Sequence, residues 1–312
     1  MFVLFIPVLL LLLLALIVIL LIKKRWKVAV PFILVVIIVN WWSECVPFRM
    51  LPLHEGNNGR NLKVMSFNID GSSNDFIIKA PRIASLIESY SPDAVFIAEF
   101  CEQNVKALDT LLAKIYPYST VNDKVYFHYF YSKYPLIDAK RLKDGESQKE
   151  IDVYSCKIDK NGDTVELYGC HLPSNNYTSE LKCFSLDSID TGSDMLDYMN
   201  NISRAYDLRT QQTKVLINDM NGSSTPFIIM GDMNDVGGSV SIKELERGGL
   251  QDAWWNGGLG YGATIYKPLP YRIDHILFSK SLGLTKIKVV DSEGLSDHDA
   301  LYAEFYFLNN KE

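Results

Sequence analysis

The pattern of hydrophobic and polar residues divides the chain into two unlike parts. Residues 2–22 are all apolar or proline, and residues 28–42 are apolar apart from one asparagine. A basic cluster, Lys-Lys-Arg-Trp-Lys, lies between them at 23–27, and the second run ends in two tryptophans. About 20 apolar residues can cross a bilayer as a helix, and tryptophan is typical of the membrane–water interface. Residues 1–42 therefore predict a membrane anchor.

Three interpretations of this anchor are open. A cleaved signal peptide carries positive charge before its apolar run and a small-residue cleavage site after it, whereas here the charge follows and no such site is present. A single transmembrane anchor is a second interpretation. We favour a hairpin of two spanning helices, although residues 28–42 reach only about 22 Å, against a hydrocarbon core of roughly 30 Å. The positive-inside rule then places the basic loop in the cytoplasm and the following chain outside it.

After the anchor, the pattern changes to short runs with two different periods. Residues 43–60, with two prolines and two glycines, predict a linker, and residues 61–312 predict one globular domain. β-rich runs recur at 62–68, 94–98, 125–131, 151–158, 164–170, 226–230, 273–278 and 301–307, and helical stretches at 75–89, 102–115, 195–220 and 239–247. In one run, Val165 and Leu167 alternate with Glu166 and Tyr168, which is the period of a strand. This mixture predicts an α/β or α+β sandwich.

Charge and cysteine content narrow the function classes. The chain after residue 42 carries 27 Lys and Arg against 37 Asp and Glu, a net charge of −10. Tight, sequence-blind nucleic-acid binding depends on many basic side chains, so this balance disfavours it. The five cysteines lack a C-x-x-C pair, which gives no readable zinc site. We interpret them as buried small hydrophobes, and one disulfide is compatible with an oxidising compartment.

The chemical signal is a polar residue repeated at the ends of predicted strands. An Asn or Asp after a strand is usually a turn former, so each residue alone is a weak signal, but their joint occurrence in this order is specific. His275 is expected on the opposite strand face from its neighbour Asp274 and is interpreted as structural, as are His54 and His128. Residues 172–194, rich in Ser, Asn and Asp, predict a long loop beside the site. The candidate site residues are Asn68, Asp70, Glu99, His171, Asp232, Asn234, Asp274, Asp297 and His298.

Three motifs in this set carry a family resemblance. They are Gly-Asp-Met-Asn-Asp at 231–235, Arg-Ile-Asp-His at 272–275 and Ser-Asp-His at 296–298, with weaker support at 131–135, 250–254 and 262–264. In this order and at these separations the chain resembles the endonuclease/exonuclease/phosphatase superfamily over nearly all of 61–309. The resemblance implies a four-layer sandwich, in which two facing mixed β-sheets are flanked by helices on both outer faces.

The chain departs from this family's pattern in ways that bear on substrate. Many members have Gln before the metal-binding Glu, where this chain has Ala98. Asp70, in Asn-Ile-Asp-Gly, resembles the abasic-endonuclease branch, whereas His171 resembles deoxyribonuclease I and the sphingomyelinases. Because the branch markers are mixed, the resemblance does not assign a substrate.

The resemblance also implies a mechanism. Asn68, Glu99, Asp70 and Asp297 are expected to form the shell of a Mg²⁺ or Mn²⁺ ion, since hard oxygen ligands suit these cations. Asp232 is expected to orient or deprotonate the attacking water. Asn234 and His171 are expected to donate hydrogen bonds to the pentacoordinate phosphorus group, and Asp274 to hold His298, which acts as general base or as electrostatic clamp.

Two enzyme functions and one binding function follow. We predict a membrane-anchored, metal-dependent hydrolase of phosphoesters, acting on lipid head groups or small phosphoesters, with its domain outside the cytoplasm. The alternative is an extracytoplasmic nuclease acting on DNA or RNA. A domain that only binds a phosphorylated ligand is disfavoured, because no catalytic residue of the pattern is missing. The sequence indicates no protein partner.

Overall fold

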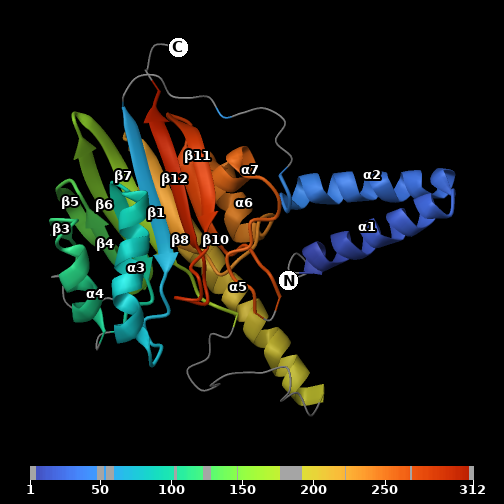
Figure 1. Ribbon diagram of the computed structural model, residues 1–312, viewed down its shortest axis with the longest axis horizontal. Coiled ribbons are helices and arrows are strands. Elements are labelled where there is room, and N and C mark those ends of the chain that lie inside the picture. Colours follow the sequence, from blue (N-terminus) through green and yellow to red (C-terminus); the bar gives the residue numbers. More distant parts are fainter. Residues whose placement is uncertain are drawn as a thin grey trace.

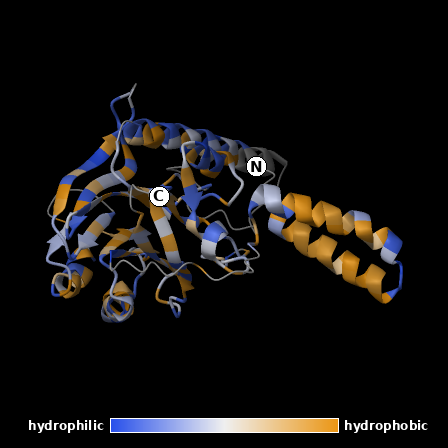
Figure 2. Cartoon of the chain, turned by 90° about the horizontal axis from the view of Figure 1, so that it is seen from above, coloured by the Kyte–Doolittle hydropathy of each residue, from blue (hydrophilic) through white to orange (hydrophobic). Residues whose placement is uncertain are grey.

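The chain begins with two helices that project from the rest of the molecule as a hairpin (Figure 1). The computed structural model describes residues 5–47, 53, 60–101, 104–121, 128–145, 147–175, 192–221, 223–267 and 269–308, and for 192–199 the backbone alone. Helix α1 is Ile6–Ile22 and helix α2 is Trp26–Ser43. Both are apolar along their length (Figure 2), and α2 is long and apolar enough to cross a membrane, whereas α1 is one residue shorter.

Two six-stranded sheets form the centre of the domain. The first has the order β11 (Leu282–Val290), β12 (Ala300–Phe307), β1 (Asn61–Asn68), β2 (Ala94–Ala98), β4 (Tyr129–Ser132), β3 (Tyr118–Ser119). The second has the order β5 (Leu136–Lys143), β6 (Glu150–Lys160), β7 (Asp163–His171), β8 (Phe227–Asp232), β10 (Asp274–Ser279), β9 (Leu250–Asp252). Each sheet has one parallel pair, β1 with β2 and β7 with β8, and its other pairs are antiparallel. Both sheets are therefore mixed.

The main hydrophobic core lies between the two sheets. Val165 and Leu167 of β7 face this core, where they join Phe96, Ile228 and others. Tyr168 belongs to a second cluster on the outer face of the same sheet. The alternation expected from the sequence is thus confirmed, and it separates two buried faces because helices cover the outside.

Helices cover the outer face of each sheet (Figure 1). Helices α3 (Phe76–Tyr90) and α4 (Val105–Leu112) pack on the first sheet, and α5 (Gly192–Met220) and α6 (Val240–Arg247) pack on the second. The short helix α7 (Ala253–Gly257) contributes Ala253 to the core between the sheets. The prediction of two mixed sheets flanked by helices is confirmed.

The structure adds elements that the sequence pattern did not predict. Strand β5 is a sheet edge with mostly exposed side chains and two irregularities in register, so it lacks the apolar alternation used to find strands. Strands β3, β9 and β11 and helix α7 were also not predicted. Of the loop expected at 172–194, residues 176–191 lie outside the described part, and 192–194 already belong to α5. Residues 125–127 of the strand predicted at 125–131 also lie outside the described part, and the strand there is Tyr129–Ser132.

Candidate active site

Strand register in the second sheet brings three predicted site residues together. The Cα of Asp232 is paired with His171 on one side and with Asp274 on the other. Paired residues of neighbouring strands point to the same face of a sheet. An imidazole and two carboxylates therefore converge at one end of β7, β8 and β10.

The first sheet supplies the opposite half of the site. Asn68 is the last residue of β1, and Glu99 directly follows β2, whose Ala98 is paired with Asn68. The Nδ2 of Asn68 donates hydrogen bonds to Glu99 Oε1 at 2.8 Å and to Asp232 Oδ2 at 3.1 Å. Asn68 thus joins the strand ends of the two sheets.

Asp232 lies at the centre of the cluster and is almost completely buried. Its Oδ1 accepts a hydrogen bond from the Asn234 backbone N–H at 2.8 Å, and its Oδ2 lies 3.7 Å from His298 Nε2. Burial, and after it the negative charge of Asp274, raises the pKa of Asp232 to about 6. This carboxylate is therefore a better proton acceptor than an exposed aspartate.

His298 lies between two buried carboxylates. Its Nδ1 is 2.8 Å from Asp274 Oδ2, and its Nε2 faces Asp232. Burial alone lowers the pKa of His298, but the negative charges of Asp274 and Asp232 and the hydrogen bond to Asp274 outweigh it and raise the pKa to about 10. The ring is therefore an imidazolium at neutral pH, which places a positive charge beside Asp232.

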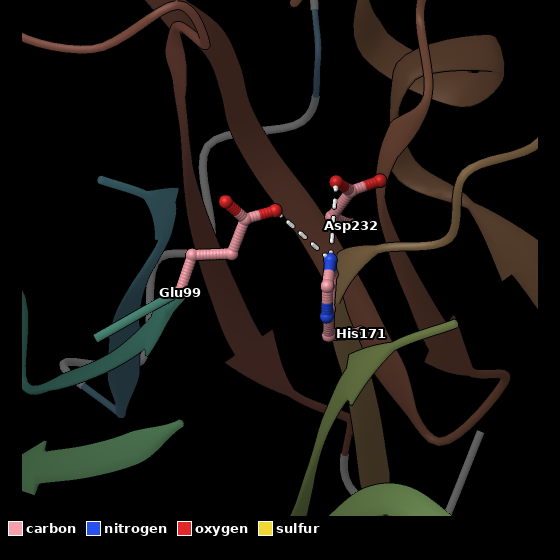
Figure 3. A group of neighbouring side chains, drawn as sticks. All are labelled: Glu99, His171 and Asp232. Atoms are coloured by element: carbon pink, nitrogen blue, oxygen red, sulfur yellow. Dashed lines mark ion pairs between the residues drawn. The ribbon is translucent and has the colours of Figure 1, made fainter. Parts of the chain in front are cut away.

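Glu99 and His171 form a pair across the gap between the sheets (Figure 3). His171 Nε2 lies 3.1 Å from Glu99 Oε1 and 3.8 Å from Asp232 Oδ2. Burial raises the pKa of Glu99, but the hydrogen bond and charge of His171, together with the hydrogen bond from Asn68, outweigh it and hold the pKa at about 2. Glu99 is consequently ionised at any physiological pH.

The acidic residues of the site fit a divalent cation. Burial, and then repulsion from Asp297 and Glu99, raises the pKa of Asp70 even though Ser72 Oγ donates a hydrogen bond to it at 2.9 Å. Mutual repulsion of this kind is relieved by a cation, and carboxylate oxygens suit Mg²⁺ or Mn²⁺. Asn68 has its nitrogen toward the carboxylates, while its Oδ1 accepts a hydrogen bond from the Asp70 N–H at 3.2 Å. To act as an oxygen ligand, its amide would have to turn over.

Asn234 lies at the rim of the cluster. Its Nδ2 donates a hydrogen bond to the Leu172 carbonyl at 2.9 Å, directly after His171. A primary amide has two N–H donors, and this bond uses one of them. This bond ties the loop after Asp232 to the end of β7, and the expected donation by Asn234 to a phosphate stays a prediction.

The backbone at these positions explains part of the Gly-Asp-Met-Asn motif. Glu99, Asp70 and Asn234 have left-handed φ values of 58°, 42° and 49°, which are uncommon for residues other than glycine and concentrate at functional sites. Gly231 has φ +145°, and a Cβ there would lie 1.9 Å from the Cys170 carbonyl oxygen. Only glycine lets β8 approach β7 this closely just before Asp232.

A pocket of about 370 Å³ opens beside Glu99 and His171. Sequence reasoning did not identify its other lining residues as part of the site, and it interpreted His128 as structural. They are Ser72, Phe100, Cys101, His128 and Asp152.

His128 both lines this pocket and holds Glu99 in place. Its Nδ1 accepts a hydrogen bond from the Glu99 N–H at 3.2 Å, and its ring centroid is 4.8 Å from that of His171. Burial, and then the charge of His171, holds the pKa of His128 well below its ordinary value, so the ring is neutral. No local signal in the sequence indicates this contact, because it arises from the antiparallel pairing of β4 with β2, which starts β4 beside the end of β2.

His275 points away from the site, as expected. Its Nε2 donates a hydrogen bond to the Asp235 carbonyl at 3.0 Å, and its Nδ1 lies 3.0 Å from Asp252 Oδ2. Arg272 donates to the same Asp252 oxygen at 2.8 Å, so the three side chains form a buried network behind the site. His54 lies outside the described residues.

Arg209 of α5 connects two loops of the site and was not singled out from the sequence. It is fully buried, and its Nη1 donates hydrogen bonds to the Pro173 carbonyl at 2.8 Å and to Asn175 Oδ1 at 3.0 Å. Its Nε donates to Asp235 Oδ2 at 3.3 Å. Because Asp235 follows Asn234 and Pro173 lies two residues after His171, Arg209 fixes both loops at once.

Comparison with known protein families identifies the family to which this chain belongs. The sequence matches the Endonuclease/Exonuclease/phosphatase family over residues 65–298, and the chain belongs to that family. The match includes every candidate site residue from Asn68 to His298. No curated protein matches the sequence significantly.

Solved structures share the fold. Truncated Caenorhabditis elegans TDP2 superposes with a TM-score of 0.59 at 20% identity, covering 81% of this chain and 100% of that one. D. rerio TDP2 complexed with single strand DNA product gives 0.57 at 19% identity, covering 78% and 98%. SmcL gives 0.55 at 17% identity, covering 79% and 99%. At such identities the likeness concerns the fold.

Proposed function

We propose that this chain is a metal-dependent hydrolase of phosphoester bonds whose active site is the cluster around Asp232. The observation that carries the proposal is that buried Asp232 lies 3.7 Å from the ring of His298 and is joined through the Asn68 amide to ionised Glu99. Phosphoester hydrolysis needs a positioned water, charge neutralisation on the phosphate oxygens and a stabilised leaving oxygen. The site residues can supply or support all three.

The acidic group would hold the cation. Glu99, Asp70 and Asp297 would bind Mg²⁺ or Mn²⁺, and Asn68 would join them after its amide turns over. The bound cation would supply Lewis-acid stabilisation of the phosphate oxygens.

Each remaining residue has a separate task in this proposal. Asp232 accepts the proton of the attacking water, which its raised pKa favours. His298, kept cationic by Asp274, stabilises negative charge on the phosphate rather than acting as the base. His171 and Asn234 donate hydrogen bonds to phosphate oxygens.

For the substrate we propose a lipid head group or another small phosphoester. The net charge of −10 after residue 42 and the apolar N-terminal helices support this class. A nuclease is the second candidate, and it is supported by the similar D. rerio TDP2 structure that contains single strand DNA product.

For the location we propose that α1 and α2 are a transmembrane hairpin and that the catalytic domain lies outside the cytoplasm. The supporting observations are the side-by-side apolar helices and the basic residues in and beside the turn that joins them (Figures 1 and 2). Protease added to intact cells should digest residues 61–308. Protection of these residues until the membrane is broken would place the domain in the cytoplasm.

One assay series tests the activity and separates the substrate classes. The full-length protein is given sphingomyelin, inositol phosphates, bis-p-nitrophenyl phosphate, plasmid DNA and RNA, each with Mg²⁺, with Mn²⁺ and with EDTA. We expect hydrolysis of a small or lipid phosphoester that is abolished by EDTA and by Asp232→Ala. Hydrolysis of nucleic acids alone supports the nuclease, and full activity in EDTA refutes the metal requirement.

A further inference from the structure

The end of the helical hairpin contacts the loop that follows Asp232 and carries Asn234. Ser43, the last residue of α2, is 1% exposed. A Cβ added at Gly238 would lie 2.7 Å from Ser43 Cα and 2.8 Å from its carbonyl oxygen, and Gly238 has φ +80°. The two backbones are therefore in direct contact, four residues after Asn234.

Side chains hold the turn after α2 in this position. Asn40 Nδ2 donates a hydrogen bond to the Val46 carbonyl at 2.8 Å, and the Val46 N–H donates to Asn40 Oδ1 at 2.9 Å. Between them, Glu44 forms an ion pair with Lys243 of α6 at 2.5 Å. Both charged side chains are largely buried, with 15% and 24% exposure, so this contact is screened less than a surface pair.

The hairpin also contacts the second loop that supports the site. Cys45 packs with Ile6 and Leu10 of α1, and Tyr261 packs against this cluster. Tyr261 lies three residues before Thr264, whose Oγ1 accepts a hydrogen bond from the Asp274 N–H at 3.2 Å. The turn thus contacts the loop after β8 and the segment leading into β10.

We propose that the turn formed by residues 43–46 is a positioning element of the active site, in addition to connecting the hairpin to the domain. The segment holds the loop that places Asp232 and Asn234, so its release lets these groups leave their productive geometry. A displacement of about 1 Å can cost on the order of 100-fold in rate. This inference rests on the proposed hydrolase function, but it does not depend on whether the helices span a membrane.

Two glycine substitutions test the contact. Gly238→Ala and Gly249→Ala both add a Cβ at a positive φ, +80° and +99°, on either side of α6. Only the first Cβ meets the hairpin, because nothing lies within 4 Å of the second. In full-length protein we expect Gly238→Ala to lower kcat by about tenfold or more, with KM nearly unchanged. Gly249→Ala should retain wild-type kcat.

Amide hydrogen exchange gives a readout that does not require activity. Gly238→Ala should speed exchange across residues 232–239, where the N–H groups of Asn234 and Val236 are hydrogen-bonded to aspartate side chains. Lys243→Met, which removes the cation that pairs with both Glu44 and Glu246, should act in the same direction if Gly238→Ala fails to fold. Arg247→Met, on the same helix α6 but paired only with Glu244 among the described residues, is its control.

The outcomes separate the two proposals. A wild-type protein that hydrolyses no phosphoester refutes the proposed function, while unchanged exchange at 232–239 in both Gly238→Ala and Lys243→Met overturns the positioning inference. Faster exchange with an unchanged kcat also overturns it, because the loop would then be loosened without consequence for the reaction.

Discussion

The substitution Asp274→Asn tests the electrostatic account of the site most directly. It keeps the side-chain shape and removes the charge 2.8 Å from His298 Nδ1, in a place where both side chains are almost completely buried. The asparagine amide can also donate to Nδ1 of His298. This favours a neutral ring with its hydrogen on Nε2, whereas Asp274 favours a ring that carries a hydrogen on Nδ1. Loss of one well-placed group of this kind costs about 10² to 10⁴ in rate, or roughly 3 to 5 kcal/mol at 1.36 kcal/mol per tenfold.

The pH profile decides whether charge is the cause. With its pKa at about 10, His298 stays protonated as pH rises and loses its positive charge only near that value. Without Asp274, the largest contribution that raises this pKa is gone, so the alkaline limb of kcat/KM should move to lower pH. The assay is a kcat/KM profile from pH 5 to pH 10 with bis-p-nitrophenyl phosphate and saturating Mg²⁺.

A neighbouring substitution serves as the control. Asp299→Asn makes the same chemical change one residue after His298, but Asp299 accepts hydrogen bonds from the Ser292 N–H at 2.8 Å and Tyr266 OH at 3.1 Å. It should leave the alkaline limb in place. If Asp274→Asn lowers the rate without moving that limb, or if both variants move it equally, the imidazolium account is refuted.

Three further substitutions test the metal shell, the buried Arg209–Asp235 ion pair, and the contact of Glu246 with Glu44 at the end of the hairpin. Glu99→Gln should raise the Mg²⁺ concentration needed for half-maximal activity, and an unchanged titration curve would remove Glu99 from the metal shell. Arg209→Met should lower stability by about 3 to 5 kcal/mol in urea unfolding, since it leaves a buried carboxylate unpaired, whereas exposed Arg204→Met should have little effect. Burial and the adjacent Glu44 raise the pKa of Glu246 from 4.5 to about 7, so stability should fall as pH rises between these values. Glu246→Gln should therefore raise the melting temperature at pH 8 but not at pH 4, and an equal effect at both would contradict the shift.

The sequence predicted the parts of the fold and site that depend on local pattern. A strand with apolar alternation, such as β7, can be predicted because its period is present in the local sequence. A residue at a strand end, such as Asp232, can be predicted because its position follows from where that pattern stops. A strand-end residue becomes a site residue only through register, and the pairing of His171, Asp232 and Asp274 agrees with the expectation that they gather. Their catalytic roles stay predictions.

Other features depend on contacts between distant segments, which one sequence does not reveal. Arg209 sits in a polar helix and has no motif around it, so nothing local indicates that it ties two loops together. His128 was interpreted as structural because its link to Glu99 arises from strand pairing, not from spacing. Residues 43–47 have the composition of a linker, yet Ser43 and Cys45 are buried against the domain.

The division of the site between the two sheets has a consequence for substitutions far from it. Asn68 and Glu99 belong to one sheet, and His171 and Asp232 belong to the other, so their separations depend on the core between the sheets as well as on the direct contacts Asn68–Asp232 and Glu99–His171. Phe96 of the first sheet lies so close to Gly169 of the second that a Cβ there would be 2.1 Å from its ring. Remodelling this interior contact changes the spacing between the two layers. The geometry of the proposed active site therefore depends on the packing of this interior, and we expect substitutions there to lower turnover before they lower the melting temperature.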